Sequence, residues 1–250
     1  MIPKTTVKLI KSLHIKKYRV NEQLFLVEGK KNILELANSD FHIHFLVSTP
    51  EFFKEHGTLL GDRVQWYQCG ETELTRLSVL EHNNTVLAVV RQHPVEEVIP
   101  GMKGKIVLAL DDIRDPGNLG TILRIADWYG IRQVIASSGT SEFYNPKVIQ
   151  ASMGSFTRVK VCYTDLEKYL KDFDGPVMGT FMEGENIHES TSMIKEGIIV
   201  FGNEARGISP ALIKHVDKKV TIPRYGQAES LNVAISCAIV LDNIKRWANE

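Results

Sequence analysis

Hydrophobic residues in the first part of the chain alternate between helical spacing and short apolar runs. Helical spacing predicts helices over residues 5–15 and 30–37, and two shorter helices that begin at Pro50 and Glu71. Apolar runs predict strands over residues 24–27, 42–47, 64–67 and 85–90. This order of elements is typical of a small α/β unit.

The segment 92–104 differs from the regions on either side. It carries two prolines and two glycines and no apolar periodicity, which is typical of a linker. The sequence therefore predicts a first domain over residues 1–91, a linker over residues 92–104 and a second domain over residues 105–250.

The second domain begins with the apolar run 106–110, which is typical of a strand covered on both faces of a parallel sheet. Further strands are predicted over residues 133–136, 159–162, 177–181, 198–201 and 219–222. Helices begin at Pro116, Pro146 and Pro210, each after a residue that can cap a helix, and a long final helix is predicted over residues 228–247. Strands that alternate with helices indicate an open, mostly parallel sheet, in which ligands bind at the carboxyl ends of the strands.

Composition excludes several classes of protein. The chain has 250 residues, 43% of them hydrophobic, which is enough for one large or two smaller cores and excludes a disordered chain. No apolar run is long enough to span a bilayer and the first residues lack a secretory signal, so a cytoplasmic protein is expected. Cys69, Cys162 and Cys237 have no metal-ligand spacing, so buried thiols are expected and no metal site.

Charge is balanced overall, with 30 basic and 30 acidic residues, but residues 1–31 hold eight basic and two acidic residues. Such a cluster can follow a phosphate backbone, because each neutralised phosphate releases counterions. A solvated helix face would have the same composition.

Common nucleotide and hydrolase motifs are absent. The chain has no G-x-G-x-x-G after the strand 106–110, no G-x-x-x-x-G-K-[ST], no H-E-x-x-H and no G-x-S-x-G. Ordinary dinucleotide-binding, ATPase, zinc-peptidase and serine-hydrolase functions are therefore disfavoured.

Three polar clusters follow predicted strands instead. The first, residues 111–124, contains Asn118 in a first-turn or pre-helix position and Arg124 inside an otherwise apolar helix, where a guanidinium needs an anion or exposure to solvent. The second, residues 202–207, has two glycines and Glu204, and could also be a simple turn. The third runs from Ile222 to a predicted first helical turn with Ser230 and Asn232, where capping alone could explain Ser230.

Together the three clusters resemble the SpoU (TrmH-like) branch of the SPOUT RNA methyltransferases. The resemblance rests on three runs, which are Asp115-Pro116-Gly117-Asn118-Leu119-Gly120 with Arg124, Gly202-Asn203-Glu204 with Gly207, and Ile222-Pro223 with Ser230-Leu231-Asn232-Val233. It covers residues 104–247. Residues 1–91 resemble the L30e-like RNA-binding domain, through their element order and the segment 21–29.

The resemblance implies an α/β fold with a deep trefoil knot, a homodimer, and S-adenosylmethionine-dependent methylation of a ribose 2′-hydroxyl in structured rRNA or tRNA. It implies that the cofactor contacts the chain near Thr180, Gly202, Ile222 and Leu231. It implies that the reacting side is lined by Asn118, Arg124, Glu204, Ser230 and Asn232. The chain departs from the family at Ala205, where glycine is common, and at Arg224, where methionine is common.

The mechanism leaves one role open. A guanidinium has a pKa above about 12, so Arg124 is expected to bind the phosphate beside the target ribose, whereas some accounts of the family make the arginine the base. Two other functions also stay open. One is an RNA-binding or ribosome-assembly factor without turnover, and the other is methylation of a protein or small molecule.

Overall fold

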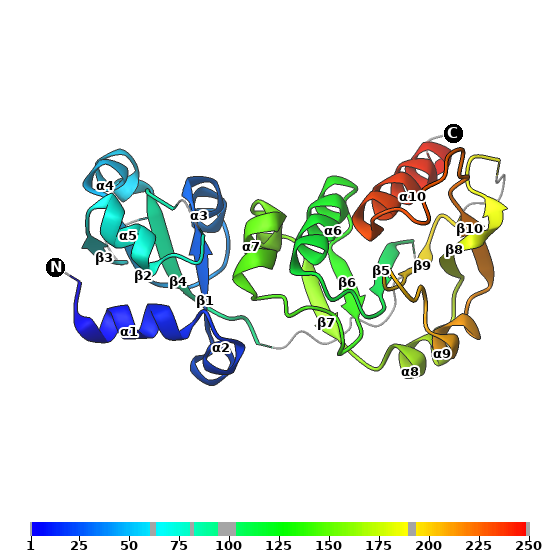
Figure 1. Cartoon of the computed structure of the whole chain (residues 1–250), viewed down its shortest axis with the longest axis horizontal. Coiled ribbons are helices and arrows are strands. Elements are labelled where there is room, and N and C mark those ends of the chain that lie inside the picture. Colours follow the sequence, from blue (N-terminus) through cyan, green and yellow to red (C-terminus); the bar gives the residue numbers. More distant parts are fainter. Residues whose placement is uncertain (1, 61–63, 81–82, 95–103, 190–193, 249–250) are drawn as a thin grey trace. The chain divides into compact units, whose positions relative to one another are not determined.

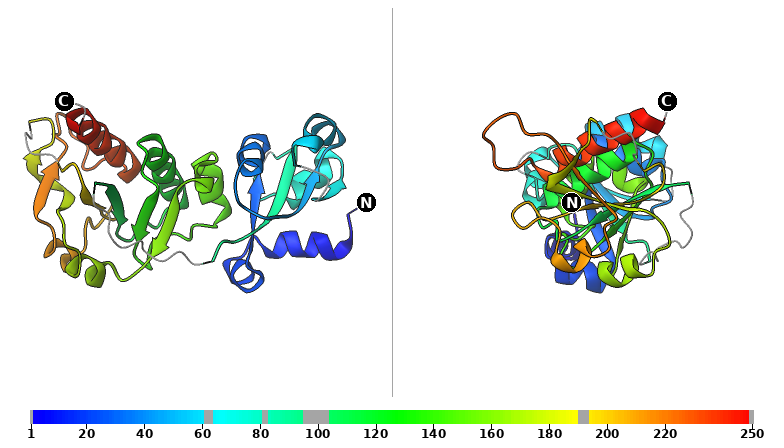
Figure 2. Two further views of the ribbon diagram at one scale, coloured as in Figure 1. Left: turned by 180° about the vertical axis from the view of Figure 1, so that it is seen from behind. Right: turned by 90° about the vertical axis from the view of Figure 1, so that its right-hand side faces the viewer.

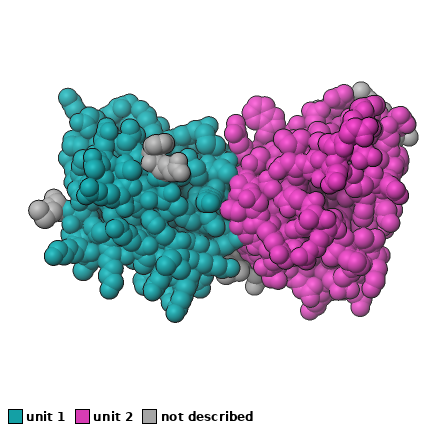
Figure 3. All heavy atoms as spheres, viewed as in Figure 1, with its two compact units in different colours: residues 1–94, 142–158 teal, residues 95–141, 159–250 magenta. Residues whose placement is uncertain are grey.

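The computed structural model describes residues 2–60, 64–80, 83–94, 104–189 and 194–248. Most of the predicted linker, residues 95–103, lies outside this part of the chain. The chain forms two compact units, which are Met1–Pro94 with Glu142–Arg158, and Val95–Ser141 with Val159–Glu250 (Figure 3). Segment Glu142–Arg158 thus groups with the first unit, whereas the predicted domain over residues 105–250 assigned it to the second.

The first unit is built on a four-stranded mixed sheet (Figure 1). Strand β4 (Val86–Arg91) pairs antiparallel with both β1 (Leu24–Glu28) and β2 (Ile43–Ser48), and β2 pairs parallel with β3 (Gln65–Gln68). The helices of this unit are α1 (Lys4–Ser12), α2 (Lys16–Glu22), α3 (Lys30–Ala37), α4 (Pro50–His56), α5 (Glu71–Leu77) and α7 (Pro146–Ser152), with short 3-10 helices η1 (Gly57–Leu60) and η2 (Ser155–Thr157).

The predicted helix over residues 5–15 is wrong at its end. Helix α1 ends at Ser12, Ile15 is extended, and the separate helix α2 follows. Helix α2 has a polar sequence without apolar spacing, but its Arg19 is buried and donates to the carbonyl oxygens of Leu13 and His14 at 2.9 and 3.0 Å. These hydrogen bonds, to carbonyl oxygens six and five positions earlier, stabilise a short helix that apolar periodicity could not reveal.

The second unit contains a six-stranded sheet whose order is β10-β8-β9-β5-β6-β7, and all neighbouring strands are parallel. This confirms the predicted parallel sheet. The strands are β5 (Ile106–Leu110), β6 (Gln133–Ala136), β7 (Lys160–Tyr163), β8 (Val177–Asn186), β9 (Gly197–Phe201) and β10 (Lys218–Thr221).

Helices cover both faces of this sheet. Helices α6 (Pro116–Trp128) and α10 (Val233–Ala248) lie side by side on one face, and α8 (Leu166–Lys171) and α9 (Pro210–Ile213) lie on the other (Figures 1 and 2). Alternate residues of β5 and β9, such as Val107 and Val200, are buried in the core beneath α8 and α9. Burial on both faces explains why these strands are continuously apolar.

Helix α6 begins as its sequence predicts. The Asp115 side chain accepts a hydrogen bond from the Asn118 backbone N–H at 2.8 Å, and Pro116 occupies the first turn, where a missing N–H costs nothing. Leu119 and Leu123 are then fully buried. The cap and the apolar stripe together fix where the helix starts and which side faces the sheet.

The predicted final helix over residues 228–247 is wrong at its start, because α10 begins at Val233 and residues 228–232 form an irregular loop. Asn232 Oδ1 accepts from the Ala234 backbone N–H at 2.9 Å, so Asn232 caps the helix. No helix in the described part of the chain is long and apolar enough to cross a membrane.

Candidate active site

Three loops meet at the carboxyl edge of the six-stranded sheet. They follow β5, β9 and β10, and they are the polar clusters of the sequence. Strands β5 and β9 are direct neighbours, and β8 separates β9 from β10. Because all the strands are parallel, their carboxyl ends lie at the same edge, which brings the three loops together.

Asn118 joins all three loops. It lies in the first turn of α6, as the sequence predicts. Its Nδ2 donates to Glu204 Oε1 at 2.5 Å, and its Oδ1 accepts from Asn232 Nδ2 at 2.8 Å. Both ends of one amide are thus used to hold side chains from the other two loops, so three of the predicted site residues form one hydrogen-bonded group.

Asn232 has a fixed orientation because both ends of its side chain are engaged. Its oxygen caps α10 and its nitrogen faces Asn118. Ser230, by contrast, is exposed in the loop before α10, three residues ahead of the first helical residue. The prediction that Ser230 belongs to the first helical turn is therefore wrong, and capping does not explain this serine.

Asn203 organises the loop after β9. Its Oδ1 accepts from the backbone N–H groups of Ala205 and Arg206 at 3.0 and 3.2 Å, and its Nδ2 donates to the Asp112 carbonyl oxygen at 2.8 Å. The loop closes on itself through two backbone hydrogen bonds between Asn203 and Gly207. A Cβ atom at Gly202 would lie 2.2 Å from the Gly207 carbonyl carbon, so glycine is required there for the loop to fold back this closely.

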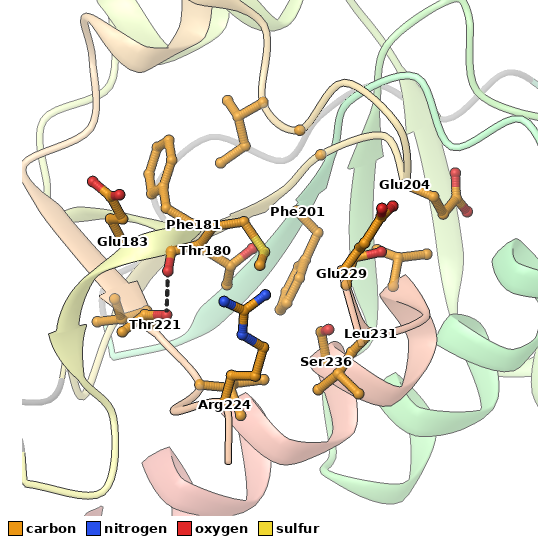
Figure 4. A pocket seen from close by; sticks show the side chains of 18 of the residues that line it. Thr180, Phe181, Glu183, Phe201, Glu204, Thr221, Arg224, Glu229, Leu231 and Ser236 are labelled. Atoms are coloured by element: carbon orange, nitrogen blue, oxygen red, sulfur yellow. Dashed lines mark hydrogen bonds between the residues drawn. The ribbon is translucent and has the colours of Figure 1, made fainter. Parts of the chain in front are cut away.

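A cavity of about 1080 Å³ opens beside this group (Figure 4). Thr180, Gly202, Ile222 and Leu231, which the sequence assigns to the cofactor, all line it, as do Glu204 and Ser230. Its apolar walls come from Phe181, Phe201, Ile208, Val233 and Val240. Its charged lining residues are Glu183, Glu204, Arg206, Lys219, Arg224 and Glu229. The cavity therefore combines apolar surface with both signs of charge.

Arg124 is separate from this cavity. It is an exposed residue of α6, six positions after Asn118, and it does not line the cavity. Within the described residues its guanidinium has neither a hydrogen bond nor an ion pair. In the single chain Arg124 is thus available to an external anion.

A model of the SpoU rRNA methylase family matches residues 105–242, more than half of the chain. The chain belongs to the SpoU rRNA methylase family. A second model, of the MRM3-like substrate binding domain, matches residues 4–88. The SpoU match covers all three loops and the cavity, and the second match covers most of the first unit.

Some relatives of this SpoU protein match it over nearly its whole length. It is 30% identical over 242 residues to the Bacillus subtilis 23S rRNA (guanosine(2553)-2′-O)-methyltransferase RlmP, covering 96% of this chain and 95% of that protein. A solved TrmH-family structure from Porphyromonas gingivalis superposes with a TM-score of 0.86 at 34% identity, over 98% of this chain and 99% of that one. The AdoMet-bound rRNA methyltransferase of Sinorhizobium meliloti gives a TM-score of 0.84 at 26% identity, over 98% and 97% of the two chains.

Some lining residues of this SpoU protein had no signal in the sequence. Glu183 belongs to β8, which continues to Asn186 although the apolar run predicts an end at Phe181. Glu229 lies in the irregular loop that the sequence assigned to a helix. The sequence did not predict either residue at the cavity, because β8 is longer and α10 is shorter than their apolar patterns indicate.

Proposed function

We propose that this SpoU protein methylates the 2′-hydroxyl of a ribose in structured RNA and uses S-adenosylmethionine as its cofactor. The observation that carries this conclusion is the hydrogen-bonded group of Asn118, Glu204 and Asn232 beside the cavity. RlmP from Bacillus subtilis is named for this reaction on 23S rRNA, and the Sinorhizobium meliloti structure holds AdoMet.

The cavity has the chemistry that this cofactor requires. Adenine needs apolar surface, which Phe201, Ile222 and Leu231 can supply. The sulfonium and ammonium groups are cations, and the carboxylates of Glu183 and Glu229 line the cavity. When bound, the cofactor supplies an activated methyl group for in-line transfer to oxygen.

We assign cofactor contacts to Thr180, Gly202, Ile222 and Leu231. The Thr180 hydroxyl donates to the Val200 carbonyl oxygen at 3.3 Å, so its oxygen can still accept one further hydrogen bond. The closely folded loop after Gly202 forms one wall. Ile222 and Leu231 flank the loop after β10, and their neighbourhood supplies backbone groups to the ligand.

We assign the reacting side to Asn118, Glu204, Ser230 and Asn232. Glu204 uses Oε1 for Asn118, which leaves Oε2 able to accept a hydrogen bond from a ribose hydroxyl. Ser230 has a free hydroxyl at the cavity wall, within the described residues, and can donate or accept. These groups orient the ribose, and alignment of the reacting atoms is a large part of catalysis in a transfer of this kind.

Arg124 is assigned to the phosphate beside the target ribose. A fixed positive charge there favours the negative charge that develops on the ribose oxygen, while the proton leaves through that phosphate or water. The alternative role of Arg124 as the base stays open. Whether Arg124 binds the phosphate or acts as the base, Arg124→Ala should abolish methyl transfer at saturating RNA.

We propose that the active form is a homodimer. Trp128 on α6 is 84% exposed and Ile235 on the adjacent helix α10 is 51% exposed. Large apolar side chains exposed on neighbouring helices fit a surface that a second copy covers. Sedimentation equilibrium should give a dimer for the wild type and a monomer for Trp128→Asp, and a wild-type monomer would overturn this assignment.

We assign RNA contact to an L30e-like domain over residues 1–91, which makes up most of the first unit. Residues 92–104 are proposed as the linker and residues 105–250 as the methyltransferase domain. The candidate RNA-binding cations of the L30e-like domain are Lys8, Lys11, Lys16, Lys17 and Arg19; Arg19, however, is buried in an ion pair with Glu142, which leaves the four lysines as the better candidates. The deep trefoil knot and a cytoplasmic location remain predictions, and three buried free cysteines fit a reducing compartment.

Transfer of labelled methyl from S-adenosylmethionine tests the proposal. Purified protein is incubated with total RNA from a strain that lacks it, and the RNA is digested to nucleosides. The expected product is a 2′-O-methylnucleoside from ribosomal RNA. RNA binding without cofactor binding would favour an RNA-binding or ribosome-assembly factor without turnover. Labelled methyl groups in protein or in a small molecule would show that the substrate is not RNA.

A further inference from the structure

Arg224 lies at the floor of the cavity, in the loop that follows β10. Its side chain points from this loop into the cavity, toward Thr180 and Phe201 (Figure 4). The resemblance to the SpoU family implies a methionine at this position. The arginine is therefore a departure from the family pattern. Arg224 is exposed to solvent, and its positive charge at the cavity favours an anionic group on a ligand bound there.

Among the described residues, most N–H donors of the Arg224 guanidinium are free, although one hydrogen bond tethers the side chain. Within the described part of the chain its one hydrogen bond runs from Nη1 to the Ala228 carbonyl oxygen, at a long 3.3 Å. An arginine has five N–H donors in a planar fork, so the edge formed by Nη2 and Nε is free. The tether holds the side chain over the cavity and lowers the entropy that a ligand must overcome to engage it.

The other two cations of the cavity are less suited to an anion. The Lys219 ammonium lies 5.2 Å from the centre of the Phe181 ring, where a cation–π contact engages it. The Arg206 guanidinium, in the loop after β9, makes no hydrogen bond within the described residues, so no tether holds it over the cavity. Arg224 is therefore the cation that combines a tether, a free donor edge and an orientation into the cavity.

We propose that Arg224 binds the α-carboxylate of the methionine part of the cofactor through the free edge of its guanidinium. This inference rests on the proposed function. The carboxylate is the one anionic group of S-adenosylmethionine, and its flat pair of oxygens matches the guanidinium fork. Glu183 and Glu229 then face the cationic groups, so the charges of the cavity complement those of the ligand.

The test uses two ligands that differ at the carboxylate. S-adenosylhomocysteine carries the complete amino-acid part, whereas 5′-methylthioadenosine retains the adenosine and sulfur but lacks the carboxylate and the amine. Binding of both is measured by titration calorimetry to the full-length wild type, Arg224→Met, Arg224→Lys and the control Arg246→Met. Arg246 is an exposed arginine of α10 that pairs with Asp242 and does not line the cavity.

Arg224→Met should weaken S-adenosylhomocysteine binding about tenfold to a hundredfold, as expected for hydrogen bonds between charged groups, and leave 5′-methylthioadenosine binding unchanged. Unchanged binding of the second ligand also reports that the variant is folded. Arg224→Lys, which keeps the charge but not the fork, should be intermediate, and Arg246→Met should match the wild type.

Three other outcomes overturn the inference. Equal losses for both ligands would mean that Arg224 shapes the loop. Unchanged binding of both ligands, with weaker RNA binding, would assign Arg224 to an RNA phosphate. A wild type that binds neither ligand would overturn the cofactor assignment itself, which separates that failure from a failure of the role of Arg224.

Discussion

Asn118 and Asn232 are 114 positions apart in the chain, and their side-chain amides are joined by a 2.8 Å hydrogen bond. The same Asn118 amide donates to Glu204 at 2.5 Å. One small side chain therefore fixes the relative positions of three loops that belong to three different strands.

Asn118→Ala should reduce kcat about a hundredfold, because Glu204 and Asn232 lose the group that positions them and small misplacements at a reacting centre are costly. S-adenosylhomocysteine binding should stay within about threefold of the wild type, since Asn118 does not line the cavity. Methyl transfer kinetics and calorimetry measure the two effects separately. Parallel losses in turnover and cofactor binding would contradict a positioning role.

Gly202→Ala should destabilise the second unit and abolish cofactor binding. The new Cβ would approach backbone atoms of Gly207 and Ile208 to 2.2 Å, and backbone cannot move aside as a flexible side chain can. Gly226→Ala is the matched control, because Gly226 also lines the cavity but a Cβ there meets nothing within 4 Å. Thermal unfolding should separate the two variants by several degrees, and equal melting temperatures would contradict this account of the loop.

Arg19→Met should strongly destabilise the first unit. Arg19 is 2% exposed, and its Nε and Nη2 donate to the two carboxylate oxygens of Glu142 at 3.2 and 2.6 Å. Removing one partner of a buried pair leaves an uncompensated charge, at a cost of about 3–5 kcal/mol. Lys30→Met breaks the exposed pair with Glu55 and should cost far less, because solvent screens an exposed pair. Urea unfolding measures both, and similar values for the two variants would contradict the role of burial.

Alkaline pH should destabilise the protein through Cys69. Burial raises the pKa of this thiol from 9.0 to about 11, so the folded state retains a proton that the unfolded state has lost. The free energy of unfolding should therefore fall as the pH rises from about 9 to about 11. In Cys69→Ala the decline should be shallower, and an identical slope in the two proteins would show that this thiol contributes nothing.

Sequence patterns predicted those parts of the fold that depend on local chemistry. The strand Ile106–Leu110 and the helix start at Asp115-Pro116 follow from an apolar run and from a capping residue before proline. Clustering of polar residues after strands also predicted a site at one edge of the sheet, since parallel strands end at one edge, and the resemblance to the SpoU family placed Asn118 in it.

Features that depend on distant contacts could not be predicted in this way. Helix α10 starts at Val233 because Asn232 caps it while also bonding to Asn118, and nothing in the local sequence distinguishes residues 228–232 from a first helical turn. Segment Glu142–Arg158 groups with the first unit through contacts such as the 4.5 Å ring separation of Phe25 and Tyr144. Such pairs form only in the folded chain.

The central claim is that the three loops around Asn118 form the active site of an rRNA 2′-O-methyltransferase. Ribose-methylation mapping of ribosomal RNA, in cells with and without the gene, tests it most directly. One 2′-O-methyl site should disappear in the deletion strain, return with the wild-type gene and fail to return with Arg124→Ala. An unchanged methylation map, or full restoration by that variant, would contradict the account.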